Sequence, residues 1–92
     1  MEKNRQKYTR DQLKAAHLKS SSHKEELMRG NVCGCFYCEQ LFSPLEITEW
    51  IDEPQGGQTA ICPKCGIDSV LGEGLPIQDK AFLNEMNTLW FG

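Results

Sequence analysis

Two short stretches, Cys33-Gly-Cys-Phe-Tyr-Cys38 and Cys62-Pro-Lys-Cys-Gly66, hold all five cysteines of this 92-residue chain. Each contains a Cys-x-x-Cys turn, here called the first knuckle (residues 35–38) and the second knuckle (residues 62–65), and 23 residues separate them. Such a turn presents two thiolates on one side of a tight loop, and two turns at about this spacing are typical of zinc sites. The pattern predicts one bound Zn²⁺, with four ligands: Cys35, Cys38, Cys62 and Cys65.

The presence of Cys33 leaves the identity of the first ligand undecided. The sulfurs of a Cys-x-Cys pair seldom both fit one ion, so all five cysteines are not expected to bind together. We favour Cys35 because its spacing to Cys38 is the usual one. Cys33 is the alternative, in which case Cys35 would pack as a small apolar side chain. Gly66 is expected to take a positive φ after the second knuckle.

A redox role is the rival interpretation of the Cys62-Pro-Lys-Cys65 string. Thiol oxidoreductases place the first cysteine at a helix N-terminus, whose dipole lowers the thiol pKa. Gly66 and the strand-like residues 67–71 argue against such a helix. The chain also shows no signal-peptide core and no membrane-spanning run, so we expect a cytoplasmic protein that does not enter membranes and whose cysteines bind metal.

Charge is unevenly spread along the chain, whose formal net charge is -3. Residues 1–30 hold eight Lys or Arg against four acids, and residues 31–92 hold two against nine. Solvated faces, or attraction between the halves, are the simpler explanations. The alternative is a nucleic-acid contact in which basic side chains meet phosphates. Its candidate residues are Lys14, Lys19, Lys24 and Arg29.

Capping signals predict two helical segments in the N-terminal third. Thr9 and Gln12 form a capping-box pattern for a helix that begins at Arg10. A second pattern, Ser22 with Glu25, predicts a short helix that ends at residue 30 with a glycine at positive φ.

Further helices and a hairpin are predicted between residues 43 and 92. The Ser43-Pro-Leu-Glu46 string predicts a helix that carries Ile47, Trp50 and Ile51 on one side and stops at Pro54. Residues 59–61 are predicted to be a strand that delivers the second knuckle and pairs with residues 67–71. Asp79 is predicted to cap a final helix with an apolar stripe, namely Phe82, Leu83, Met86, Leu89 and Trp90.

Two histidines and four aromatic residues have both structural and functional interpretations. His17 and His23 are expected to face solvent or to cap helices; the alternative is an enzyme that uses His23 and Glu26 beside the metal. The aromatic side chains are expected to belong mostly to the core rather than to stack on nucleic-acid bases. They are Tyr37, Trp50, Trp90 and Phe91.

These patterns predict one compact α+β domain, with a basic helical segment over residues 1–30 and a zinc-binding domain over residues 31–92. Its fold class is a small zinc-ribbon-like or treble-clef-like domain with a short β-hairpin and three to four helices. Because four thiolates close a zinc site, the zinc is expected to be structural. The expected function is non-enzymatic, as an interaction or adaptor module with a protein partner; a nucleic-acid-associated factor and a metal-dependent enzyme are the alternatives.

The strings Cys33-Gly-Cys-Phe-Tyr-Cys38, Phe42-Ser-Pro-Leu-Glu-Ile47 and Thr59-Ala-Ile-Cys-Pro-Lys-Cys-Gly-Ile-Asp-Ser-Val70 resemble those of a family of small bacterial proteins usually labelled only "cytoplasmic protein". The resemblance covers residues 20–91. It implies a zinc-ribbon-like domain in a bacterial cytoplasm, and it implies no particular activity.

Overall fold

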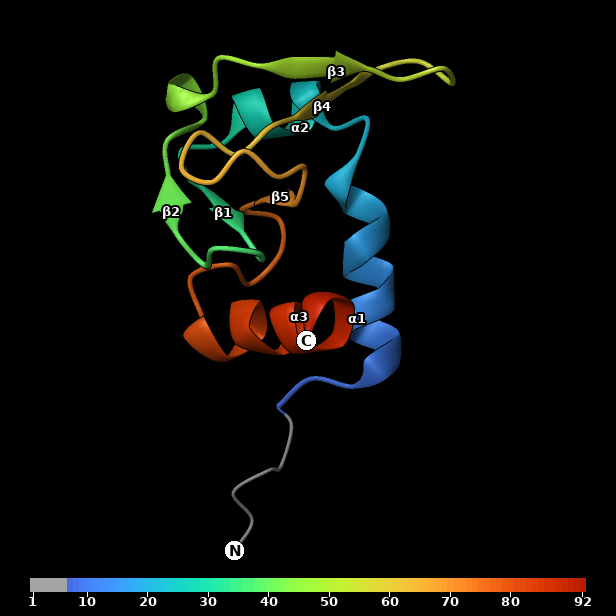
Figure 1. Ribbon diagram of the computed structural model, residues 1–92, viewed down its shortest axis with the longest axis vertical. Helices are drawn as coiled ribbons and strands as arrows, with labels where there is room; N and C mark the ends of the chain where they lie inside the picture. Colours follow the sequence, from blue (N-terminus) through green and yellow to red (C-terminus); the bar gives the residue numbers. More distant parts are fainter. Residues whose placement is uncertain (1–6) are drawn as a thin grey trace, which may run out of the picture.

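Residues 7–92, which the computed structural model describes, form three α-helices and two small antiparallel sheets (Figure 1). This arrangement confirms the predicted α+β class. The helices are α1 (Arg10–His17), α2 (Lys24–Arg29) and α3 (Lys80–Phe91), and 3₁₀ turns lie at Leu18–Ser20 and Pro44–Glu46. One sheet has the order β2-β1-β5 and the other pairs β3 with β4. The strands are β1 (Cys33–Cys35), β2 (Leu41–Phe42), β3 (Trp50–Asp52), β4 (Gln58–Ala60) and β5 (Val70–Gly72).

Helix α1 begins as predicted, at a capping box. The Gln12 backbone N–H donates to Thr9 Oγ1 over 3.1 Å, and the Thr9 N–H donates to the Gln12 side chain over 2.8 Å. Its inward face buries Leu13 and Ala16 in the same apolar cluster as Phe82 and Met86 of α3. In Figure 1, α3 lies below the sheets, and α1 stands upright at one end of α3 and contacts it.

The predicted capping of α2 is wrong at both ends. Ser22 has a left-handed φ of 51° and its hydroxyl donates to the Gly56 carbonyl, so His23 takes the N-cap position without a side-chain cap. At the other end, Gly30 is extended rather than left-handed, with φ -96°. The Glu73 carboxylate accepts the next two backbone N–H groups, and a Cβ on Gly30 would lie 3.1 Å from that side chain. Close approach of Glu73 therefore explains the glycine.

The predicted helix over residues 43–54 is also wrong beyond its first turn. Ser43 caps the turn as predicted and forms a capping box with Glu46, but only the 3₁₀ turn Pro44–Glu46 follows. Residues 50–52 become β3, which pairs with β4 in the register Trp50↔Ala60 and Asp52↔Gln58. Backbone pairing with a neighbouring strand has overridden a side-chain spacing that suited a helix.

Strand β4 delivers the second knuckle as predicted, but its partner is not the predicted one. Residues 67–71 do not pair back onto β4. Strand β5 instead lies antiparallel to β1, with Cys35 opposite Val70. Because Cys35 ends β1 and the second knuckle precedes β5, this pairing brings the two knuckles together.

Helix α3 starts at Asp79, whose carboxylate accepts the Ala81 N–H over 3.0 Å, as predicted. Its side chains Phe82, Leu83 and Met86 are buried. A second apolar cluster surrounds the cysteines and includes Leu27 of α2. No helix within residues 7–92 is long and apolar enough to cross a membrane.

Candidate metal centre

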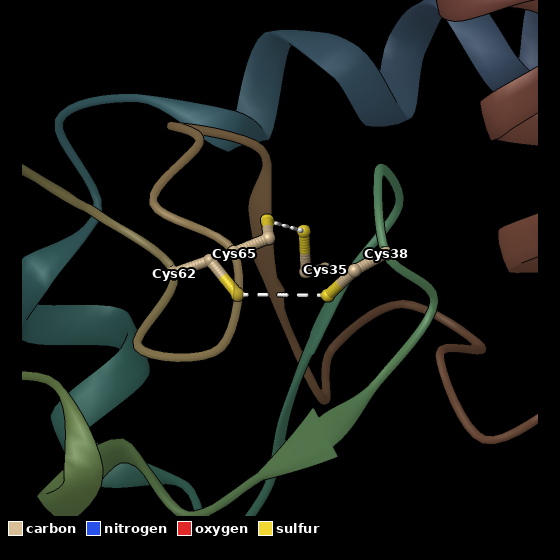
Figure 2. Close-up of side chains that lie close together, drawn as sticks. All are labelled: Cys35, Cys38, Cys62 and Cys65. Atoms are coloured by element: carbon tan, nitrogen blue, oxygen red, sulfur yellow. Dashed lines mark hydrogen bonds between the residues drawn. The ribbon is translucent and has the colours of Figure 1, made fainter.

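Four cysteine sulfurs converge between the two knuckles. The Sγ atoms of Cys35, Cys38, Cys62 and Cys65 all lie within 4.8 Å of one another. Figure 2 shows the two side chains of each knuckle pointing toward those of the other. Across this gap, Cys35 Sγ lies 3.7 Å from Cys65 Sγ and Cys38 Sγ lies 3.7 Å from Cys62 Sγ.

These distances fit a tetrahedral thiolate site. Bonds of about 2.3 Å from a zinc ion to four sulfurs make a tetrahedron with edges of about 3.8 Å. The 3.7 Å separations match these edges, whereas a disulfide would need about 2.05 Å. Four cysteines arranged in this way could hold one metal ion.

Backbone N–H groups surround the sulfurs in the same pattern in both knuckles. The N–H of Tyr37 donates to Cys35 Sγ and that of Lys64 donates to Cys62 Sγ, each over 3.3 Å. At the second cysteine of each knuckle, burial raises the pKa and has the larger effect, against which the backbone of Gln40 acts to lower the pKa of Cys38 and the backbone of Ile67 acts to lower that of Cys65. The two N–H donors at Cys35 and Cys62 stabilise the thiolate form of those sulfurs.

Ser69 is a residue of the site that the sequence analysis missed. It is buried, and its hydroxyl oxygen lies 3.1 Å from Cys35 Sγ, in hydrogen-bond range. The missed signal was its position between the second knuckle and β5, since the β1–β5 pairing carries Ser69 to the first knuckle.

As free thiols, these cysteines do not ionise together readily. Burial raises the pKa of Cys38 to about 11, and burial also raises the pKa of Cys65. At Cys62, burial is outweighed by the N–H groups of Lys64 and Cys65, so its pKa lies below the usual value. A divalent cation at the centre would favour the thiolate form of all four.

Cys33 is not part of the group. It is fully buried, two residues before Cys35 on β1, and burial raises its pKa to about 11. It pairs with Gly72 of β5 and packs in the cluster around Leu27. The structure therefore brings Cys35 rather than Cys33 to the other three sulfurs.

The second knuckle does not open a helix. Gly66 follows it with φ 81°, the positive value predicted, and irregular chain with a bend at Asp68 leads on to β5. The helix-terminal cysteine that the redox interpretation needs is absent from this segment. An ion pair of 3.1 Å between Lys64 and Glu46 ties the second knuckle to the 3₁₀ turn before β3.

Neither histidine belongs to the sulfur group. His23 was expected to face solvent or to cap a helix. Its ring is buried rather than solvent-facing, and the residue takes the N-cap position of α2 without a side-chain cap. Its Nε2 accepts the Ala60 N–H over 3.0 Å, so the ring is the Nδ1–H tautomer and donates to the Lys19 carbonyl over 2.9 Å. His17 is half-buried and stacks on Trp90, with centroids 4.0 Å apart.

The four basic candidates do not form one patch. Lys14 and Lys19 are exposed on α1 and the 3₁₀ turn that follows it. Lys24 and Arg29 belong to α2, where they line a hollow together with the acidic side chains of Glu25 and Glu26. The Lys24 ammonium lies 5.0 Å from the centroid of the Trp50 ring.

Three of the four aromatic residues expected in the core lie at the surface. Tyr37, Trp90 and Phe91 are 46%, 37% and 46% exposed, whereas Trp50 packs against the cluster around the cysteines. The surface rings gather where α3 ends on the first knuckle: the Phe91 ring lies 4.8 Å from that of Tyr37 and 5.6 Å from that of Phe36. The expectation that these three aromatic side chains belong to the core is therefore wrong.

Comparison with protein families, with curated proteins and with solved structures finds no match for this chain. The resemblance to small bacterial proteins and the likeness to a zinc ribbon or treble clef therefore stay predictions. The candidate site rests on the positions of its own sulfur atoms.

Proposed function

We propose that Cys35, Cys38, Cys62 and Cys65 bind one structural Zn²⁺ ion and that the chain is a non-enzymatic interaction or adaptor module of the cytoplasm. The observation that carries the metal assignment is the set of four sulfurs with tetrahedral spacing. Four thiolates leave no open position for a substrate or a water molecule, which favours a structural role for the ion.

The choice of zinc rests on the chemistry of the ligands. Four soft thiolates in a tetrahedron suit Zn²⁺ or iron among the common cellular metals. Metal analysis of the purified protein, with zinc and iron measured in the same sample, should give one zinc per chain. One iron per chain, or no metal at all, would contradict the zinc assignment.

Paired substitutions test the ligand set. Cys35→Ser and Cys62→Ser should each lose the bound zinc, because each removes a thiolate. Cys33→Ser is the matched control, since Cys33 is buried near the site but stands outside the sulfur group. Native mass spectrometry should find zinc retained in the control. Loss of zinc from Cys33→Ser with retention in Cys35→Ser would reverse the assignment.

The proposed interaction role is supported by the surface rather than by the metal. Exposed aromatic side chains gather at one end of α3, and such side chains are enriched at interfaces. The enzyme alternative has less support, because both ring nitrogens of His23 are hydrogen-bonded to backbone groups. Affinity capture with the zinc-loaded chain, repeated with Phe91→Ala, should identify partners that depend on this surface.

A further inference from the structure

A hollow lies between the end of α1, the loop before β5 and the end of α3. Its volume is about 470 Å³, within the range of about 300–1,000 Å³ that small-molecule pockets occupy. Rings form much of its wall, and polar side chains join them. The residues that matter here are the rings of His17, Phe36, Trp90 and Phe91 and the polar Ser21 and Asp68.

The rings are held in place by their neighbours. Trp90 stacks on His17 with an interplanar angle of 32°. The side-chain amide of Asn87 donates to the carbonyls of Phe36 and Tyr37, over 3.1 and 2.8 Å, so α3 is fixed to the first knuckle beneath Phe91. A partner that stacks on these rings would meet a surface with little conformational freedom left to lose.

Cations flank the hollow along α1. Lys14 lies one helical turn before His17 and Leu18, which both line the hollow, and Lys19 follows directly. Arg10 is one turn further back, and all three cationic side chains are exposed. The ion pairs among residues 7–92 are Lys7–Asp79 and Lys64–Glu46, so these three cations are not neutralised there.

One acid stands at the hollow itself. Asp68 is exposed and accepts no side-chain hydrogen bond from residues 7–92. Its carboxylate would repel a phosphate in the hollow, and it would accept a hydrogen bond from an amino group on a base. The charges therefore favour a base in the hollow and phosphates along α1.

From this arrangement we propose that the hollow binds an unpaired base of single-stranded nucleic acid, stacked against Trp90 and Phe91, while Arg10, Lys14 and Lys19 contact the adjoining phosphates. The proposal rests on the interaction role above and names its partner. Aromatic faces accept any base by stacking, and Asp68 adds a preference for bases that carry an amino group, such as cytosine, over thymine.

Tryptophan fluorescence of the full zinc-loaded chain tests the proposal. The Trp50→Phe variant leaves Trp90 as the reporter, because the chain has two tryptophans. Short oligo(dC) should quench this emission at low salt and bind more tightly than oligo(dT). The logarithm of the affinity should fall with that of the salt concentration, with a slope of about -2 if three phosphates are neutralised.

Substitutions test whether the hollow and the cations of α1 bind the oligonucleotide. Phe91→Ala should weaken oligo(dC) binding about ten-fold, because it removes one of the two stacking rings. Leu45→Ala is the matched control, because Leu45 is 80% exposed and lies outside this surface, and its binding should not change. Asp68→Ala should abolish the preference for oligo(dC), and Lys14→Gln should reduce the salt slope by about 1.

Other outcomes would overturn the proposal. They are the absence of quenching at low salt, equal affinity for duplex DNA or for cytidine monophosphate, and unchanged binding by Phe91→Ala. Capture of a protein through Phe91 by a chain that binds no oligonucleotide would overturn it as well. Zinc is measured in every sample, so a zinc-loaded chain that fails to bind contradicts this inference and leaves the structural zinc site standing.

Discussion

At the scale of single residues, Ser69 shows how the site depends on more than its sulfurs. Its buried hydroxyl lies 3.1 Å from Cys35 Sγ and can donate to the thiolate. Outer partners of this kind orient a metal ligand and stabilise its charged form.

Replacing Ser69 should therefore weaken metal binding without abolishing it. We expect Ser69→Ala to lower the affinity for zinc by about 10–100-fold, as measured by competition with a chromogenic chelator. Ser21→Ala is the control, because Ser21 is exposed and is not in the sulfur group. Equal affinities in the two variants would show that the hydroxyl does not act on the thiolate.

His23 should titrate at an unusually low pH. Burial lowers its pKa below the usual value of about 6.5, because the charged ring would lose its hydration. As the pH falls below 6.5, the unfolded chain takes up a proton that the folded chain refuses, so His23 reduces stability there.

NMR of the imidazole nitrogens measures this directly, with the metal site left intact. We expect a midpoint below 6.5 and an unprotonated Nε2 at neutral pH. A midpoint at or above 6.5, or a proton on Nε2, would contradict the hydrogen bond from Ala60.

At the scale of elements, Asp79 joins two parts of the chain. Its carboxylate caps α3 and also accepts a hydrogen bond of 2.6 Å from the Tyr8 hydroxyl. The same carboxylate forms an ion pair with the Lys7 ammonium at 2.7 Å. These contacts fasten the segment before α1 to the start of α3. The Lys7 and Tyr8 hydrogen bonds, with the Ala81 N–H, lower the pKa of Asp79 to about 2.

This lowered pKa predicts an acid-dependent contribution to stability. Because the folded pKa lies below the unfolded one, the contribution is present above pH 4 and disappears as the pH falls toward 2. Asp79→Asn keeps a capping side chain and removes the charge. The variant should be less stable than the wild type at pH 6, where the carboxylate is charged and the metal site is intact.

Thermal unfolding of the two zinc-loaded proteins at pH 6 gives the measurement. Both keep the same metal site at this pH, so the difference in melting temperature isolates Asp79. Equal melting temperatures would show that the charge plays no part.

Local capping signals were predictive except where a distant contact competed for the capping residue, as at Ser22, whose hydroxyl donates to the Gly56 carbonyl. Elements fixed by distant partners were not predictable. Thr9, Ser43 and Asp79 all cap turns as predicted, because a capping hydrogen bond involves neighbours within three residues. The strand around Trp50 was missed because its partner β4 lies beyond a turn. The sequence of residues 43–54 alone contains no signal for that pairing.

The residues of the candidate site were likewise predictable in part. The knuckle spacing led to all four sulfurs, and the usual Cys-x-x-Cys geometry favoured Cys35 over Cys33. Ser69 and Asn87 could not be predicted, because they reach the first knuckle only through the β1–β5 pairing and the docking of α3.

At the scale of the whole molecule, the metal should decide whether the chain stays folded. One knuckle follows β1 and the other follows β4, so the four sulfurs join the two sheets (Figure 1). Structural zinc in small domains contributes about 10–16 kcal/mol of binding free energy, which is coupled to folding.

Chelation should therefore unfold the protein. We expect excess chelator under reducing conditions to abolish the near-ultraviolet circular dichroism of the aromatic side chains, and added zinc to restore it. The Cys33→Ser variant should respond in the same way. An apo chain with an unchanged melting temperature would show that the cysteine group does not stabilise the fold.

The separation of the knuckles also has a consequence for folding kinetics. The chain between Cys38 and Cys62 carries β2, the second 3₁₀ turn, β3 and β4, so joining the knuckles closes a long loop. Closure entropy grows only slowly with loop length, about (3/2)RT ln n. If one knuckle binds the ion first, the second knuckle then binds an ion that is already attached to the same chain. Its binding is therefore an intramolecular step. Refolding rates that rise with zinc concentration and then reach a plateau would mark this order of events.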